Sequence, residues 1–143
     1  MNSPTEMLIA RCSVAATPAD PNYRQTLRCG RHALLADERA ARGGADAGPM
    51  PFEYLLAALG SCTSITLRMY AERKGWSLDN VTVSLALRRE QDAYSIERRV
   101  TLSAPLTAEQ QASLAQICEK TPVTLALKSG ASIATTLVVA DGP

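Results

Sequence analysis

The segment 51–74 most constrains what this chain can fold into. Its residues predict a single helix, because Pro51 suits a first helical position and Gly75 suits a C-terminal stop. The first half, YLLAALGSC at 54–62, is apolar on every side except at Ser61. A helix of that kind must be buried all round. The second half carries several charged residues and is expected to emerge toward solvent.

The remaining segments predict short strands and one further helix around this central helix. Alternating apolar residues and turn signals predict strands at 7–16, 23–30, 31–38, 81–90, 95–103 and 131–140. Thr107 and Gln110 form a capping box that begins a second helix, which runs to about Lys120 and is stopped by Pro122. Consecutive strands joined by short turns favour antiparallel pairing. The fold class is therefore α+β with a mainly antiparallel sheet.

We expect a single domain over 1–143, made of an N-terminal hairpin region 7–38, a loop 39–50 rich in Gly, Pro and Ala, and a helix-containing body 51–140. One layer of sheet covers only one face of the helix at 51–74. The other face needs a second subunit. The sequence thus predicts an intimate homodimer in which this helix is central.

Charge and hydropathy exclude several classes of partner. The formal net charge is +1, which provides no field that would attract nucleic acid or an anionic membrane. No apolar run reaches the roughly 18 residues that a membrane-spanning helix requires. The first residues, MNSPTEM, lack the basic and apolar regions of a signal peptide. We therefore expect a cytoplasmic protein without nucleic-acid or membrane partners.

The chain has four cysteines, at 12, 29, 62 and 118, and a single histidine, His32. They form no C-x-x-C motif, so neither a zinc site nor another metal or cofactor is expected. Alternation places Cys12 on the apolar face of its strand, which favours a core position. In a reducing compartment the simplest role of each cysteine is that of a small buried hydrophobic residue.

Cys62 lies about three turns into the helix at 51–74, beside the small hydroxyl residues Ser61, Thr63 and Ser64. A cysteine reacts as its thiolate, which needs a nearby cation or oriented hydrogen-bond donors. Burial in the middle of an apolar helix would have the opposite effect. From the residues alone, Cys62 is either packing or a nucleophile that an arginine reaches from elsewhere. Cys118, on the apolar face of the second helix, is either core or a second reactive thiol.

A longer pattern resembles a known family. The run from Arg31 to Trp76, with GPMPFEYLLAALGSCT at 48–63 as its specific part, and the run 117–137 closely resemble the OsmC/Ohr family, in particular its general OsmC-like branch. The resemblance covers roughly residues 7 to 138. It implies an α+β fold, an intertwined homodimer with two long central helices, and active sites at the dimer interface.

The resemblance also implies a thiol-dependent peroxidase that reduces organic hydroperoxides. Cys62 matches the cysteine that attacks the peroxide and becomes a sulfenic acid. Cys118 is the candidate for the second thiol, which would resolve the sulfenic acid as a disulfide. An arginine and a glutamate would fix the thiolate, and a dithiol such as a lipoylated protein would reduce the enzyme again.

Two positions depart from the family's pattern. The second cysteine usually stands directly before a proline, where this chain has Thr121, with Cys118 three residues earlier. The glutamate usually follows the helix-starting proline directly, where this chain has Phe52 and then Glu53. On one continuous helix Glu53 and Cys62 are about 13 Å apart along the axis and on opposite sides. Glu53 would reach Cys62 only through a helix break, for example at Gly60, or from the partner subunit.

The roles of the charged candidates stay open at this stage. Glu53 equally suits a first-turn acid that favours the helix dipole. Arg24 is the nearest match to the family's arginine, with Arg28 and Arg31 as competitors, and each suits a solvated surface charge. His32 suits a hydrogen-bonding residue at a strand end.

Three functions therefore compete. The first is the peroxidase, in which Cys62 is the nucleophile, Cys118 the resolving thiol, and Arg24 and Glu53 stabilise the thiolate. The second is a non-catalytic relative that binds a small apolar ligand at the dimer interface. The third is a one-cysteine thiol enzyme resolved by an external thiol.

Overall fold

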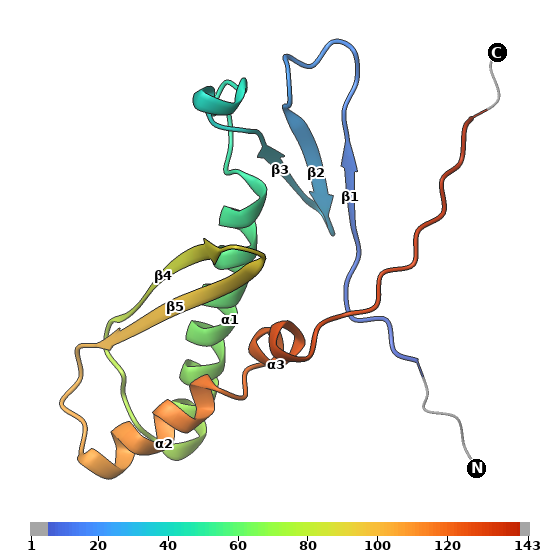
Figure 1. Cartoon of the computed structure of the whole chain (residues 1–143). Helices are drawn as coiled ribbons and strands as arrows, with labels where there is room; N and C mark the ends of the chain where they lie inside the picture. The colour runs from blue at the N-terminus through green and yellow to red at the C-terminus, as the bar shows by residue number, and fades with distance from the viewer. Residues whose placement is uncertain (1–5, 141–143) are drawn as a thin grey trace. The chain divides into compact units, whose positions relative to one another are not determined.

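The computed structural model of the chain describes residues 6–140 (Figure 1). The described part has two antiparallel sheets and three α-helices, which confirms the predicted α+β class. The described residues divide into two compact units with their boundary between residues 55 and 56, and the two units are described separately below.

The N-terminal unit contains an antiparallel sheet in the order β1–β2–β3, formed by Cys12–Ala15, Gln25–Cys29 and His32–Ala36. The first strand is shorter than the predicted 7–16, because its pairing with β2 covers only these four residues. The turn between β2 and β3 has two residues and starts with Gly30, whose φ is +61°. A glycine adopts this left-handed conformation without steric cost, which explains the tight hairpin. Cys12 is exposed rather than part of a core, because no described residue of this unit covers its face of the sheet.

The loop after β3 is organised by Asp37, whose residue exposure is only 2%. Its carboxylate accepts hydrogen bonds from the backbone N–H groups of Glu38, Ala45 and Ala47 at 2.8–3.1 Å. The short 3₁₀-helix η1, Ala40–Arg42, lies within the loop that these bonds close. This loop has no strand pairing to hold its backbone. The three N–H groups bound to one carboxylate therefore give it a defined shape.

The helix α1, Pro51–Lys74, has the predicted bounds. Gly75 ends it with a φ of +72°, and the N–H of Trp76 returns to the carbonyl of Ala71. The helix is continuous through Gly60, so the break that would turn Glu53 toward Cys62 does not occur.

The C-terminal unit packs α1 from residue 56 onward against the hairpin of β4, Val81–Glu90, and β5, Ala93–Leu102 (Figure 1). At Gly60 a Cβ atom would lie 2.8 Å from Cδ1 of Leu85, so the helix and β4 approach closely there. The buried core lies farther along, where α1, the following loop and α2 meet; its members are Leu67, Ala71, Leu78 and Leu114. The hairpin covers one side of α1 only, and the apolar residues Ile65 and Met69 stay 53% and 58% exposed on the helix.

The helix α2, Ala108–Cys118, begins with the predicted capping box of Thr107 and Gln110. It is followed by a helix that was not predicted, α3, Pro122–Ser129. Thr121 caps α3, since its side-chain oxygen accepts from the N–H of Thr124, and Pro122 occupies the first helical turn. The proline that was expected only to stop one helix therefore also starts the next.

The predicted strand at 131–140 is wrong for the chain by itself, because this segment has no regular structure. A strand needs a neighbour to accept and donate its backbone hydrogen bonds, and no strand of the described residues pairs with it. Its apolar side chains stay exposed: Ile133, Leu137 and Val139 at 85–90%. Within residues 6–140, no helix combines the length and apolar character needed to cross a membrane.

Candidate active site

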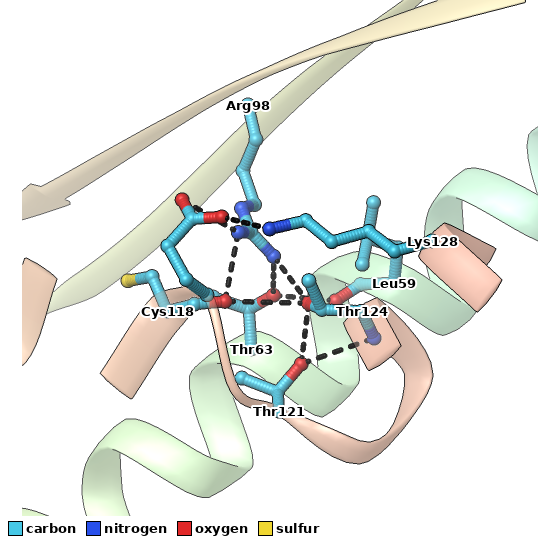
Figure 2. Close-up of polar contacts among 8 residues, drawn as sticks. Leu59, Thr63, Arg98, Cys118, Thr121, Thr124 and Lys128 are labelled. Carbon is cyan, nitrogen blue, oxygen red and sulfur yellow. Dashed lines mark hydrogen bonds and ion pairs between the residues drawn. The ribbon is translucent and has the colours of Figure 1, made fainter. Parts of the chain in front are cut away.

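Arg98 is the centre of the most densely bonded polar cluster in the C-terminal unit (Figure 2). It lies on β5 in the row of Ile96, Val100 and Leu102, which faces inward. Its side chain is only 12% exposed. A guanidinium stays charged in proteins and needs partners for its donors when it is buried. The surrounding helices supply these partners.

Three elements contribute acceptors to Arg98. Nη1 donates to the hydroxyl of Thr63 on α1 at 3.0 Å and to that of Thr124 on α3 at 2.8 Å. Nη2 donates to the backbone carbonyl of Cys118, at the end of α2, at 2.8 Å. The exposed carboxylate of Glu119 lies 3.7 Å from Nη2. One cation therefore joins β5 to α1, α2 and α3.

The hydroxyls around Arg98 are themselves paired. Thr63 donates to the carbonyl of Leu59 at 2.7 Å while it accepts from Arg98. Thr121 and Thr124 share a hydrogen bond of 2.6 Å between their hydroxyl oxygens. Thr63 and Thr121 are completely buried. Thr121, which stands where the family pattern has a cysteine, is thus a buried cap of α3 that supports the Arg98 cluster.

Cys118 is half-buried and packs against the apolar core. It also lines a cavity of about 600 Å³ between β5 and α2, together with Leu67, Val100, Leu102 and Leu114 among others. Burial raises the pKa of the Cys118 thiol, while the positive charge of Arg98 acts in the opposite direction. This thiol keeps its proton more strongly than a free cysteine, which suits a resolving thiol better than an attacking one.

Cys62 is half-buried on α1, directly before Thr63. Its sulfur lies 4.0 Å from the hydroxyl of Thr66, one turn farther along the helix. Because neighbouring helical residues point about 100° apart, Cys62 does not share the direction of Thr63 toward Arg98. The residues that line the cavity beside Cys118 do not include Cys62.

Arg24 and Glu53 both lie in the N-terminal unit and have partners there. Arg24 forms an ion pair with Asp20 at 3.3 Å. Glu53 accepts from the backbone N–H of Met50 at 3.0 Å, and its other oxygen lies 3.6 Å from the guanidinium of Arg39. Of the four predicted site residues, Cys62 and Cys118 thus belong to one unit, and Arg24 and Glu53 to the other.

The sequence reasoning missed Arg98 as a functional candidate. The signal was present, because Arg98 interrupts an otherwise apolar alternation from Ile96 to Leu102. A charged residue in the inward row of a strand has to be paired with other polar groups. This requirement alone identifies Arg98 as a candidate for the centre of a polar site. The described residues contain no group of His, Cys, Asp and Glu side chains suited to hold a metal ion.

A family model described as OsmC-like protein matches residues 43–136, which include α1, the β4–β5 hairpin, α2 and α3. The chain therefore belongs to the OsmC-like protein family. No curated protein matches it.

Solved structures share the fold at low sequence identity. An OsmC-like protein from Mycoplasma pneumoniae is 13% identical with a TM-score of 0.72, covering 85% of this chain and 88% of its own. An organic hydroperoxide resistance protein OsmC from Legionella pneumophila is 15% identical with a TM-score of 0.65, covering 87% and 92%. The organic hydroperoxide resistance protein OhrB of Bacillus subtilis is 17% identical with a TM-score of 0.58, covering 85% and 91%.

Proposed function

We propose that this protein is a thiol-dependent peroxidase that reduces organic hydroperoxides with Cys62 as its nucleophile. The observation that carries the proposal is the place of Cys62: a free, half-buried thiol on the central helix, inside the segment that matches the family. Two proteins of the same fold are named organic hydroperoxide resistance proteins, which supports this substrate class.

In the proposed reaction the Cys62 thiolate attacks the outer oxygen of the hydroperoxide. The O–O bond breaks, the alcohol leaves after taking up a proton, and Cys62 becomes a sulfenic acid. The Cys118 thiol then attacks the sulfenic sulfur and water leaves, which forms a Cys62–Cys118 disulfide. A dithiol reductant, of which a lipoylated protein is one example, restores both thiols by exchange.

Three residues are proposed to support the thiols. Arg98 holds the carbonyl of Cys118 and the hydroxyl of Thr63, the neighbour of Cys62, and so fixes the ends of α2 and α3 against the middle of α1. Arg24 and Glu53 remain candidates for stabilising the Cys62 thiolate, as the resemblance implies. Because α1 is unbroken, Glu53 would take this role from the second subunit of a homodimer.

We further propose that the protein works in the cytoplasm as a homodimer. The cytoplasm is a reducing compartment, in which the thiols of the proposed reaction can be restored. The exposed apolar side chains of Ile65 and Met69 on α1 support a second subunit.

Turnover of cumene hydroperoxide with a dithiol reductant tests the function. We expect wild-type protein to consume the dithiol in proportion to the peroxide, and Cys62→Ser to lose this turnover by a factor of at least about 100, because no other thiol takes over the attack. Cys12→Ser is the matched control and should retain it. No turnover in the wild type, or unchanged turnover in Cys62→Ser, would remove the proposal.

One observation favours the non-catalytic alternative, in which the protein binds a small apolar ligand. The cavity of about 600 Å³ is lined by both apolar and polar residues of β5 and α2, and Cys62 is not among them. A chain without peroxide turnover that binds an apolar fluorescent probe, with binding lost in Leu114→Glu, would fit this alternative.

A further inference from the structure

Cys12 and Cys29 face one another across the N-terminal sheet. They are directly paired residues of the antiparallel strands β1 and β2. Their sulfur atoms lie 2.7 Å apart, and both are free thiols. No other pair among the four cysteines shows a sulfur–sulfur contact in the described residues.

The backbone already has the spacing that a disulfide needs. Directly opposed residues of an antiparallel pair have Cα atoms about 4.5–5.5 Å apart. Disulfides span Cα separations of about 4.4–6.8 Å. Cys12 and Cys29 can therefore be joined without moving either strand.

The two thiols differ in exposure. Cys12 is exposed, while Cys29 is half-buried. The hydrogen bond with Cys12, followed by burial and by the charge of Cys12, raises the pKa of Cys29. Cys29 thus keeps its proton more strongly than an ordinary thiol, and the exposed Cys12 is the sulfur that an approaching reagent meets first.

We propose that Cys12 and Cys29 form a second redox site, a dithiol that cycles to a cross-strand disulfide by exchange with small disulfides of the glutathione disulfide class. This site is separate from Cys62 and Cys118 in sequence and lies in the other compact unit. It does not depend on the proposed peroxidase activity.

The exchange proceeds in two displacements. The Cys12 thiolate attacks one sulfur of glutathione disulfide, whose S–S bond breaks, and one glutathione leaves as a thiolate that takes up a proton. Cys29 then loses its proton and attacks the Cys12 sulfur, which releases the second glutathione. In sum, the two protein thiols lose two protons and two electrons, and the small disulfide becomes two thiols.

The bond would fasten an edge strand that little else holds. Every residue of β1 is exposed, and among the described strands β1 pairs with β2 alone. Its attachment therefore rests on the ladder of four residue pairs from Cys12–Cys29 to Ala15–Thr26. Oxidation would join β1 to β2 covalently at the end of the ladder that lies away from their connecting turn. Reduction would remove this bond.

The test uses the full-length double variant Cys62→Ser, Cys118→Ser, in which Cys12 and Cys29 are the only thiols. The protein is incubated with excess glutathione disulfide, and remaining thiols are then blocked with N-ethylmaleimide. We expect the mass of one chain, not covalently linked to another, that has lost two hydrogen atoms and reacts with no N-ethylmaleimide. Trypsin should yield the peptide 12–24 joined to the peptide 29–31, and dithiothreitol should separate them.

Adding Cys12→Ser to this variant is the matched control and should leave Cys29 unable to form the link. Glutathione held on both cysteines without a link, unreacted thiols, or links only between molecules would overturn the proposal. The same peptides can be mapped in wild-type protein, which gives a second reading if the double variant does not fold. The double variant lacks Cys62, and the experiment uses no peroxide. Its result is therefore independent of whether the protein is a peroxidase.

Discussion

At the scale of single residues, Arg98 shows how a buried charge organises this fold. Its guanidinium donates to two threonine hydroxyls and one backbone carbonyl, which come from three different helices. Its ion pair with the exposed Glu119 adds little, because water screens that carboxylate. The hydrogen bonds to the buried acceptors are therefore the larger contribution.

Arg98→Met should destabilise the folded protein by about 3 kcal/mol, because the methionine removes three hydrogen bonds from a buried cation that joins β5 to three helices. Arg99→Met is the matched control, since Arg99 is the next residue on β5 and is exposed. It should change the free energy of unfolding by no more than about 0.5 kcal/mol. Urea unfolding measures both. Equal stability of the two variants would contradict the central place of Arg98.

Sequence reasoning reached the cysteines at this scale more easily than the arginine. Cys62 stands out because a specific surrounding pattern identifies it. Arg98 was visible only as an interruption of an apolar face, and its partners Thr63 and Thr124 lie 35 and 26 residues away in the chain. Such contacts depend on how α1 and α3 pack, which alternation along one strand does not encode.

At the scale of elements, the loop after β3 depends on one carboxylate. The carboxylate of Asp37 accepts hydrogen bonds from three backbone N–H groups. These bonds, of which the one from Ala47 has the largest effect, hold the pKa of the Asp37 carboxyl below its ordinary value of 3.8. A group whose pKa is lower in the folded state contributes stability above its unfolded pKa. That contribution is lost as pH falls below 3.8 and through the folded pKa.

Asp37→Asn should therefore lower stability at neutral pH and flatten the acid limb of the stability curve. In the wild type the fall in urea midpoint below about pH 4 includes the protonation of Asp37, and the variant lacks this part. Asp46→Asn, at an exposed position of the same loop, should keep the wild-type pH profile. An unchanged acid limb in Asp37→Asn would contradict this role of the carboxylate.

Local sequence signals predicted most helices and strands correctly. They failed where an element depends on pairing with a distant segment. The bounds of α1 and the cap of α2 follow from Pro51, Gly75 and the Thr107 capping box, which act within a few residues. The strand predicted at 131–140 has the right alternation but no neighbour in the single chain. Sequence reasoning missed the helix α3 because it assigned Pro122 only the role of ending the preceding helix, although Thr121 and Pro122 together form a helix start.

At the scale of the whole molecule, many large apolar side chains are exposed to solvent. They include those of Ile65 and Met69 on α1 and those of Ile133, Leu137 and Val139 in the C-terminal segment. Water exposure of this much apolar surface favours association. It agrees with the homodimer that the helix at 51–74 predicts.

Ile65→Glu should therefore shift the protein from dimer toward monomer at micromolar concentration, because it places a charge in the expected interface. Arg73→Glu, in the last turn of α1, is the control and should leave the mass unchanged. Light scattering coupled to size exclusion measures both. A wild-type protein that is monomeric in this measurement would contradict the dimer.

The most direct test of the central claim, that Cys62 is a peroxide-reactive thiol, is peptide mapping after one equivalent of cumene hydroperoxide. We predict a disulfide that joins the tryptic peptides 43–68 and 100–120, which contain Cys62 and Cys118. A sulfenic acid or mixed disulfide on Cys62 alone would keep the nucleophile and remove Cys118 as its resolving partner. A Cys62 thiol that remains unmodified while the peroxide is present would contradict the account.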